Sequence, residues 1–164
     1  MERLWAPWRM RYVARAEEKA SGPRCFLCAG WARPEDDRHS LVLARAGTAL
    51  ALLNRYPYGA GHVLVAPARH LAACADLSAA EAADLWRLLT ATQQALGLLM
   101  RPDGFNIGIN QGAAAGAGVA DHLHMHVVPR WAGDHNYMTV LADARVLPEA
   151  LDETWRRLEP LYRG

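Results

Sequence analysis

The stretch Asp121-His122-Leu123-His124-Met125-His126-Val127-Val128-Pro129 is the most informative part of this sequence. Residues two apart in a β-strand lie on the same face of the sheet, so the alternation places three imidazoles on one face and Leu123, Met125 and Val127 on the other. Packing alone rarely requires three alternating histidines. We therefore predict a strand over residues 122–128, ended by Pro129, whose polar face carries chemistry.

Two kinds of chemistry suit this histidine face. The imidazoles can bind a metal, or one of them can attack phosphorus while the others hold the phosphate. The preceding loop contains Gly112, Gly116 and Gly118 among four alanines. Such a loop leaves backbone N–H groups open to an anion, as phosphate-binding loops require. The loop therefore favours a phosphate ester as the ligand.

The remaining sequence predicts an α+β fold with a mainly antiparallel sheet. Ser78 and Glu81 form a capping box that opens a helix over 78–100, and leucines at helical spacing continue it. An aromatic arm at Met1–Tyr12 precedes an irregular loop over 20–40. The other predicted elements are strands at Leu41–Ala46, Thr48–Leu53, His62–Ala66 and Phe105–Asn110, and a C-terminal helix at Pro148–Tyr162 with Pro148 in its first turn.

Composition excludes several classes of protein. The 164 residues suit one domain, and 52% hydrophobic and 21% charged residues are not typical of a disordered chain. A net charge of +1 gives no general attraction to nucleic acid or to an anionic membrane. The start lacks the apolar region of a signal peptide, and no apolar run is long enough to span a membrane. Three cysteines suit the reducing cytoplasm, where we expect the protein.

The sequence resembles the histidine triad family of nucleotide hydrolases and transferases, whose motif is His-x-His-x-His followed by two apolar residues. The resemblance covers roughly Leu41 to Met138. Residues 51–55, 61–65, Gln111 and 129–134 look like the branch that contains the fragile-histidine-triad hydrolases. Leu4-Trp5-Ala6-Pro7-Trp8-Arg9-Met10 and residues 121–131 look more like bacterial members described as diadenosine tetraphosphate phosphorylases.

This resemblance implies a fold, a reaction and a set of site residues. The fold is a five-stranded sheet with one long and one C-terminal helix, commonly in a homodimer. The substrate is a purine dinucleoside polyphosphate or mononucleotide, with Mg²⁺ as a candidate counter-ion. His124 attacks the α-phosphorus and becomes nucleotidylated, and phosphate or water then releases the nucleotide. His126 stabilises charge on the phosphoryl oxygens, His122 orients the site or binds metal, and Asn54 and Gln111 contact the ribose and phosphates.

One position departs from the fragile-histidine-triad pattern. Those hydrolases carry a glutamine four residues before the first histidine of the motif, where this chain has Gly118. Backbone N–H groups between Gly116 and Val119, or the incoming phosphate, must then take over the role of that side chain. Phosphorolysis and hydrolysis therefore both remain open.

A second candidate site begins at Cys25-Phe26-Leu27-Cys28, which has the spacing of a zinc knuckle. A redox pair is disfavoured because no strand-to-helix setting surrounds Cys25, and the other alternative is two reduced cysteines without metal. Family members that bind zinc through such a pair imply His70 and His122 as the remaining ligands of a structural site, and His39 is the rival fourth ligand. The domain then divides into an arm and knuckle loop (1–40), a catalytic core (41–138) and an extension with a helix (139–164).

Three other functions compete with dinucleoside polyphosphate cleavage. Another branch of the family hydrolyses nucleoside phosphoramidates, which comparison of the two substrate types would separate. A nucleotide-binding sensor would bind tightly with negligible turnover. A metal-binding interaction protein would lose metal, rather than a covalent intermediate, on His124→Ala.

Overall fold

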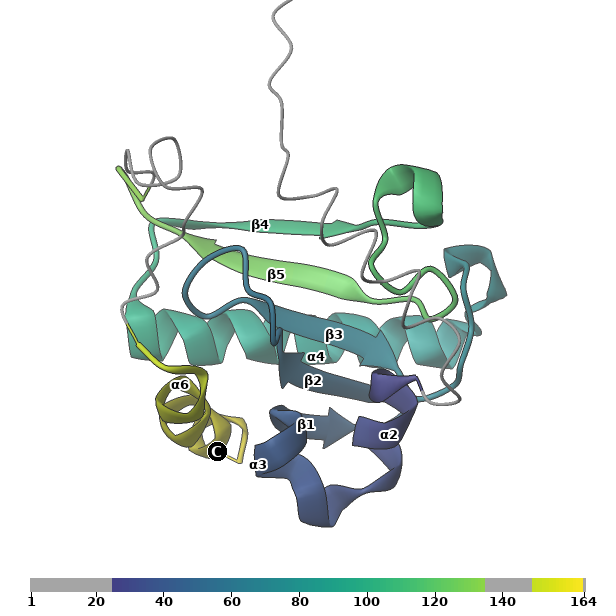
Figure 1. Ribbon diagram of the computed structural model, residues 1–164, viewed down its shortest axis with the longest axis horizontal. Coiled ribbons are helices and arrows are strands. Elements are labelled where there is room, and N and C mark those ends of the chain that lie inside the picture. The colour runs from purple at the N-terminus through teal and green to yellow at the C-terminus, as the bar shows by residue number, and fades with distance from the viewer. Residues whose placement is uncertain (1–24, 135–148, 164) are drawn as a thin grey trace, which may run out of the picture.

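The computed structural model describes residues 25–134 and 149–163, in which a five-stranded sheet packs between the long helix α4 and the short helix α2 (Figure 1). The aromatic arm Met1–Tyr12 lies outside the described residues. The strands are β1 (Val42–Ala46), β2 (Ala49–Leu53), β3 (Val63–Pro67), β4 (Gly104–Ile109) and β5 (Met125–Arg130). The helices are α2 (Phe26–Ala32), α3 (Asp37–Ser40), α4 (Ala79–Met100) and α6 (Leu151–Leu158), with 3-10 turns η1 (Pro34–Asp36), η2 (Cys74–Asp76), η3 (Ala113–Ala115) and η4 (Glu159–Tyr162).

The sheet has the strand order β1-β2-β3-β5-β4, and each neighbouring pair is antiparallel. This confirms the predicted α+β class with a five-stranded antiparallel sheet. The turn between β1 and β2 needs Gly47, because its φ is +57° and a Cβ there would lie 2.2 Å from Asp84 Oδ2. Asp84 accepts hydrogen bonds from both Thr48 N and Thr48 Oγ1, which attaches α4 to this hairpin.

Helix α4 covers one face of the sheet, as Figure 1 shows. Its capping box is present as the sequence predicts: Glu81 N donates to Ser78 Oγ, and Ser78 N donates to the Glu81 carboxylate. Burial of each leucine side chain contributes about 1.5–3 kcal/mol, so this interface is the main source of stability. The buried contacts join Leu85, Leu88, Leu89 and Leu96 to Leu53, Val63, Val65, Met125 and Val127.

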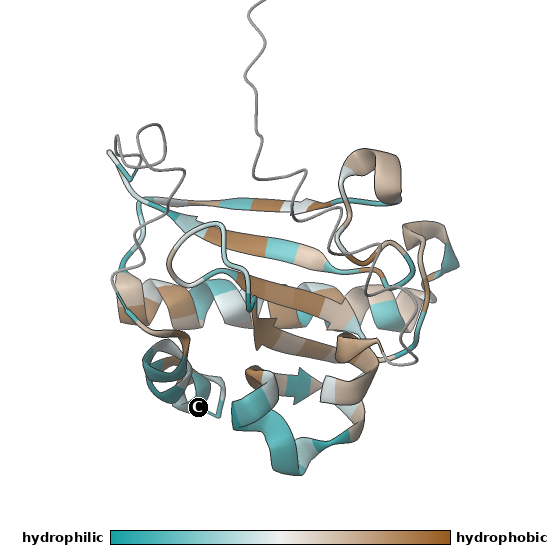
Figure 2. Ribbon diagram, viewed as in Figure 1, coloured by the Kyte–Doolittle hydropathy of each residue, from teal (hydrophilic) through white to brown (hydrophobic). Residues whose placement is uncertain are grey.

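The opposite face of the sheet carries a smaller apolar cluster. Leu27 of α2 is fully buried there among side chains of β1, β2 and β3. Strands β2 and β3 are mainly hydrophobic in Figure 2, whereas β1 is mixed and α3 beside it is hydrophilic. Its members beside Leu27 are Val42, Leu50, Leu52, Leu64 and Ala66. All of them come from β1, β2 and β3, so the cluster covers only part of this face.

The two edges of the sheet differ. At β1, the Trp155 indole of α6 donates a 2.7 Å hydrogen bond to Val42 O, beside a register shift between Val42 and Ala44. At β4, the outer edge exposes Ile107 and Ile109, whose relative exposures are 42% and 37%. One edge is therefore covered by the C-terminal helix, and along the other no described strand pairs with β4 on its outer side.

Three expectations for secondary structure are wrong. The irregular loop predicted up to Ser40 contains α2, η1 and α3, because Leu27 packs into the sheet and gives this segment a buried anchor. Strand β5 begins at Met125 rather than His122, and it continues through Pro129 to Arg130. Pro129 is tolerated because pairing with β3 ends at Val127, so only β4 lies beside it. The C-terminal helix begins at Leu151, and Pro148 lies outside the described residues.

In the part of the chain that the structure describes, no helix combines the length and the apolar character that crossing a membrane requires.

Candidate active site and metal cluster

The three histidines of the 121–129 stretch lie where the chain enters β5. Leu123 N donates to Leu71 O at 2.6 Å, which fixes the approach to the strand. Met125 and Val127 point into the core under α4, while His126 pairs across the sheet with Leu64 of the opposite cluster. The alternation predicted from sequence therefore holds, although only His126 of the three lies within a paired strand.

His124 is buried, with 5% of its surface exposed, and one of its ring nitrogens is engaged. Nδ1 lies 2.9 Å from His122 O. A carbonyl oxygen only accepts, so Nδ1 carries the proton and Nε2 of the neutral ring keeps its lone pair. Burial lowers the pKa of His124 below its ordinary value, which keeps the ring neutral near pH 7. The arrangement leaves a fixed, unprotonated imidazole nitrogen.

His126 has a different partner. Its Nδ1 lies 3.0 Å from Nε2 of His62, which is almost fully buried. Burial, and then the neighbouring His124, lower the pKa of His126 to about 4, so this ring is also neutral near pH 7. Its ring centroid lies 5.0 Å from that of His124. The two imidazoles therefore form a pair that can act on one group.

His62 is a site residue that the sequence analysis did not assign. The turn between β2 and β3 holds it: Tyr58 N lies 3.0 Å from His62 Nδ1, and Asn54 Nδ2 lies 3.3 Å from the same atom. Gly61 lets the backbone of this turn lie close to α4, because a Cβ at this residue would lie 2.7 Å from Met100 Sδ. The Gly61-His62 pair lies within one of the stretches that carry the resemblance, which is the signal that could have identified it.

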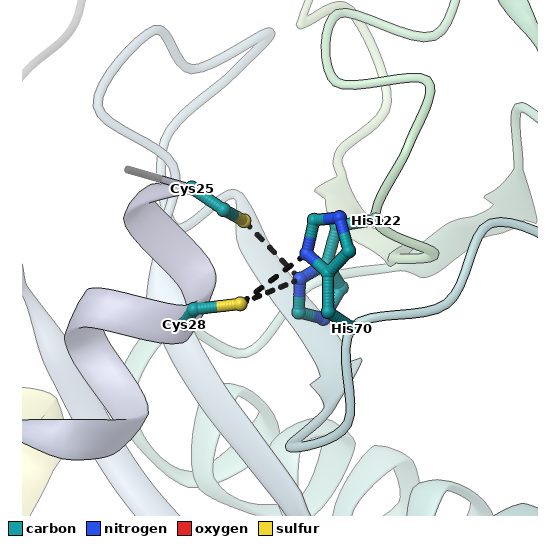
Figure 3. Close-up of side chains that lie close together, drawn as sticks. All are labelled: Cys25, Cys28, His70 and His122. Atoms are coloured by element: carbon teal, nitrogen blue, oxygen red, sulfur yellow. Dashed lines mark hydrogen bonds between the residues drawn. The ribbon is translucent and has the colours of Figure 1, made fainter. Parts of the chain in front are cut away.

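The structure brings four predicted metal ligands together, as Figure 3 shows. Cys25 directly precedes α2, Cys28 lies in the first turn of this helix, and His70 follows β3. Cys25 Sγ lies 3.2 Å and Cys28 Sγ 3.5 Å from His122 Nδ1, and Cys28 Sγ lies 3.3 Å from His70 Nδ1. All four ligand atoms lie within 4.8 Å of one another, and the rival His39 is not in this cluster.

These distances fit a tetrahedral metal ion. Zinc–sulfur and zinc–nitrogen bonds of about 2.0–2.3 Å place neighbouring ligand atoms roughly 3.5 Å apart. His122 Nε2 lies 2.9 Å from Pro67 O, so it carries the proton and leaves Nδ1 free to bind metal. In the metal-free chain, burial and the neighbouring Cys25 raise the pKa of Cys28 to about 11, so metal binding there must release a proton.

The two side-chain amides predicted to bind substrate, Asn54 and Gln111, differ in exposure. Asn54 is half-buried, and its Oδ1 accepts from Tyr56 N at 3.0 Å. Gln111 is exposed, and its Oε1 accepts from Cys74 N at 2.9 Å. Both amides are thus oriented by backbone donors. The NH₂ group of Asn54 lies 3.3 Å from His62 Nδ1, which leaves its second N–H as a donor, and Gln111 also keeps its NH₂ group as a donor.

The glycine-rich loop is partly closed on itself. Gly116 N donates to Ala113 O at 2.9 Å, and Ala117 N donates to Gly112 O at 3.3 Å. Within the described residues, the amides of Gly118 and Val119 donate no backbone hydrogen bond. Of the N–H groups between 116 and 119 that we predicted to bind an anion, those of Gly116 and Ala117 are bonded within the loop. Those of Gly118 and Val119 are the ones that remain candidates.

Comparison with known proteins agrees with these observations. The family model described as HIT domain matches residues 35–133. An AP-4-A phosphorylase from Mycobacterium tuberculosis is 39% identical over 162 residues, which cover 96% of this chain and 83% of that protein. An asymmetrical bis(5'-nucleosyl)-tetraphosphatase from Schizosaccharomyces pombe is 36% identical over 95 residues, 58% of this chain and 52% of that protein.

Solved structures show the same fold. A Zn-bound histidine triad family protein from Mycobacterium smegmatis superposes with a TM-score of 0.65 at 25% identity, covering 85% of this chain and 93% of that one. A histidine triad nucleotide-binding protein from Sulfolobus tokodaii gives a TM-score of 0.63 at 25% identity, covering 85% of this chain and 89% of that one. The matched domain, the relative that aligns over 96% of this chain and the shared fold show that this chain belongs to the HIT-domain family.

Proposed function

We propose that this protein cleaves dinucleoside polyphosphates at the α-phosphate through a nucleotidyl intermediate on His124. The observation that carries the proposal is the 2.9 Å contact of His124 Nδ1 with His122 O, because it directs the lone pair of the neutral ring to Nε2. The AP-4-A phosphorylase and tetraphosphatase relatives act on substrates of this class by their names.

The reaction has two displacement steps. His124 Nε2 attacks the α-phosphorus, a P–N bond forms, and the bond from the α-phosphorus to the bridging oxygen breaks, which releases the remaining nucleotide. An oxygen of inorganic phosphate or of water then attacks the same phosphorus and breaks the P–N bond. His126 donates to the phosphoryl oxygens, and the amides of Asn54, Gln111, Gly118 and Val119 hold the substrate. Mg²⁺ is the counter-ion that we propose for the polyphosphate.

A structural zinc ion belongs to this proposal. Cys25, Cys28, His70 and His122 would hold it, and their donor set of two thiolates and two imidazoles is one that zinc prefers in closed, four-coordinate sites. When bound, zinc supplies a covalent link between α2 and the approach to β5. The thiols are free in the structure, which suits the reducing cytoplasm that we propose for the protein.

A homodimer is also proposed, with β4 as its contact. Among the described strands, β4 lies at the edge of the sheet with no partner on its outer side, and Ile107 and Ile109 are exposed there. An unpaired strand edge with apolar side chains is a template for pairing with a second strand. Sedimentation of the wild type and of an Ile107→Lys variant tests this: the variant should be a monomer.

Product analysis tests the reaction. We would incubate the protein with diadenosine tetraphosphate, with and without inorganic phosphate, and separate the products by ion-exchange chromatography. ADP with ATP, formed only with phosphate, identifies phosphate as the acceptor. AMP with ATP under both conditions identifies water. Absence of products, together with cleavage of adenosine 5'-phosphoramidate, would overturn the proposal in favour of phosphoramidate hydrolysis.

A further inference from the structure

The turn between β2 and β3, residues 54–62, lies against the imidazole of His126. The ring of Tyr58 stacks on the His126 ring, with a centroid distance of 5.5 Å and an interplanar angle of 23°. It also contacts the His62 ring at 4.6 Å with an angle of 45°. The relative exposure of Tyr58 is 45%, so its ring is partly covered where it lies against the two imidazoles.

The hydrogen bonds of the same turn determine where the proton of His62 lies. Tyr58 N is a backbone donor and lies 3.0 Å from His62 Nδ1. The amide of Asn54 points its Nδ2 at the same atom, because its Oδ1 accepts from Tyr56 N. Two donors on Nδ1 exclude a proton there, so neutral His62 carries its proton on Nε2.

That proton determines the tautomer of His126. His62 Nε2 lies 3.0 Å from His126 Nδ1, so the His62 proton is donated to this nitrogen. Neutral His126 must then carry its own proton on Nε2. His124 has the opposite arrangement, because its Nδ1 donates to His122 O and its Nε2 is unprotonated. The two neighbouring rings thus present a lone pair on one Nε2 and a proton on the other.

We propose that Tyr58 is a positioning residue that holds His126 in the tautomer with a proton on Nε2, through its backbone N–H on His62 and its ring stacked over the His62–His126 contact. The ring limits rotation of His126 and keeps water from competing for its Nδ1. His126 then donates to a phosphoryl oxygen without first becoming charged. This role rests on the proposed function for its use, but the tautomer itself exists without substrate.

The first test reads the tautomers directly. Long-range ¹H–¹⁵N spectra of the imidazoles at pH 7.5, without nucleotide, distinguish protonated from unprotonated ring nitrogens. We expect a protonated Nε2 for His62 and His126 and a protonated Nδ1 for His124. Tyr58→Ala keeps the backbone donor to His62 and removes only the ring over the His62–His126 contact. If the ring holds His126 in place, its signals should shift toward a mixture of tautomers in this variant. An unchanged His126 spectrum in Tyr58→Ala, or a wild-type His126 protonated on Nδ1, overturns the proposal.

Kinetics with diadenosine tetraphosphate give the second test. Tyr58→Ala should lower kcat roughly tenfold, less than the ~10²–10³-fold loss on outright removal of an oxyanion donor, and should leave KM within about twofold. Both variants keep the backbone N–H of residue 58, and Tyr58→Phe also keeps the ring, so it should restore both the kcat and the spectrum. Trp86→Ala removes an aromatic ring exposed on α4 and should match the wild type.

The outcomes separate this inference from the proposed function. A raised KM with unchanged kcat in Tyr58→Ala would mean that Tyr58 contacts substrate, and equal losses in Tyr58→Phe and Tyr58→Ala would mean that the hydroxyl acts; both overturn the positioning role. If the wild type cleaves no dinucleoside polyphosphate, the proposed function fails, while the spectra still decide whether Tyr58 controls the His126 tautomer.

Discussion

The two faces of the sheet are built from the same strands and are used differently. Under α4, Met125 and Val127 meet leucines in a continuous apolar core. On the other face, the next positions along the same stretch are histidines whose ring nitrogens contact fixed partners: His122 on Pro67, His124 on His122, and His126 on His62. One face therefore carries the larger apolar cluster, and the other carries the histidines that we propose for the chemistry. Substitutions on the two faces should have separable effects.

The largest effect is expected at His124. His124→Ala removes the nitrogen that we propose as nucleophile, so turnover of diadenosine tetraphosphate should fall by at least ~10³-fold while the thermal midpoint changes little. Rapid acid quenching with labelled substrate should trap a nucleotidylated wild type and leave the variant unlabelled. His39→Ala, a histidine outside the site, is the control. Labelling of the His124→Ala variant would contradict the assignment.

On the α4 face, Leu88→Ala should have the reverse signature. Leu88 is buried in the main core, so the cavity should lower the free energy of unfolding by about 3 kcal/mol, with kcat per folded molecule unchanged. Urea unfolding measures the first quantity and steady-state kinetics the second. Leu98→Ala on the same helix is the matched control, because Leu98 is 73% exposed. A large fall in kcat for Leu88→Ala would show that the two faces are coupled.

The metal cluster joins the two roles, because His122 contributes its side chain to the cluster and its carbonyl oxygen to His124. Cys28→Ser should abolish the rise of the thermal midpoint with added zinc, which in the wild type corresponds to about 2.7 kcal/mol at a zinc concentration one hundred times the dissociation constant. Metal analysis should find zinc in the wild type and in Cys74→Ser, but not in Cys28→Ser. Equal zinc in all three proteins would exclude this cluster.

The smallest effect is expected at Glu81, where α4 begins. Hydrogen bonds from Arg69 and from Ser78 N lower the pKa of Glu81 from 4.5 to about 2. Because the folded pKa is the lower one, the stabilisation is complete above pH 4.5 and is lost as the pH falls toward 2. The thermal midpoint of Glu81→Gln should therefore lie below that of the wild type at pH 7, and the gap should close near pH 2. A gap that persists at pH 2 would contradict this origin.

Patterns that are local in sequence were enough to predict most of the fold. The helix from Ser78 and the strands around Gly47 have strong short-range signals and are present. The alternating histidines also predicted a strand, which is present from Met125 onward. Helix α2 was missed because its seven residues make only about two turns, too few to show a recurring apolar pattern. Its anchor is the burial of Leu27 against strands that lie further along the chain.

The site could be predicted only in part, for a similar reason. Spacing pointed to Cys25 and Cys28, and the family resemblance added His70 and His122. The structure places these four residues together. His62 and Tyr58 were not assigned. A single histidine such as His62 forms no repeating pattern in the sequence. Its contact with His126 joins residues that are 64 positions apart. Only the folded sheet brings them together.

The unequal edges of the sheet have a consequence for assembly. If β4 pairs with β4 of a second copy, the combined sheet ends on both sides at β1, where the Trp155 indole already occupies Val42 O and α6 covers the strand. In the sheet that the described residues form, no strand edge then remains open for a third copy. Pairing through β4 is therefore self-limiting: it gives a closed two-fold particle and excludes growth into a filament, although each chain has an exposed apolar strand.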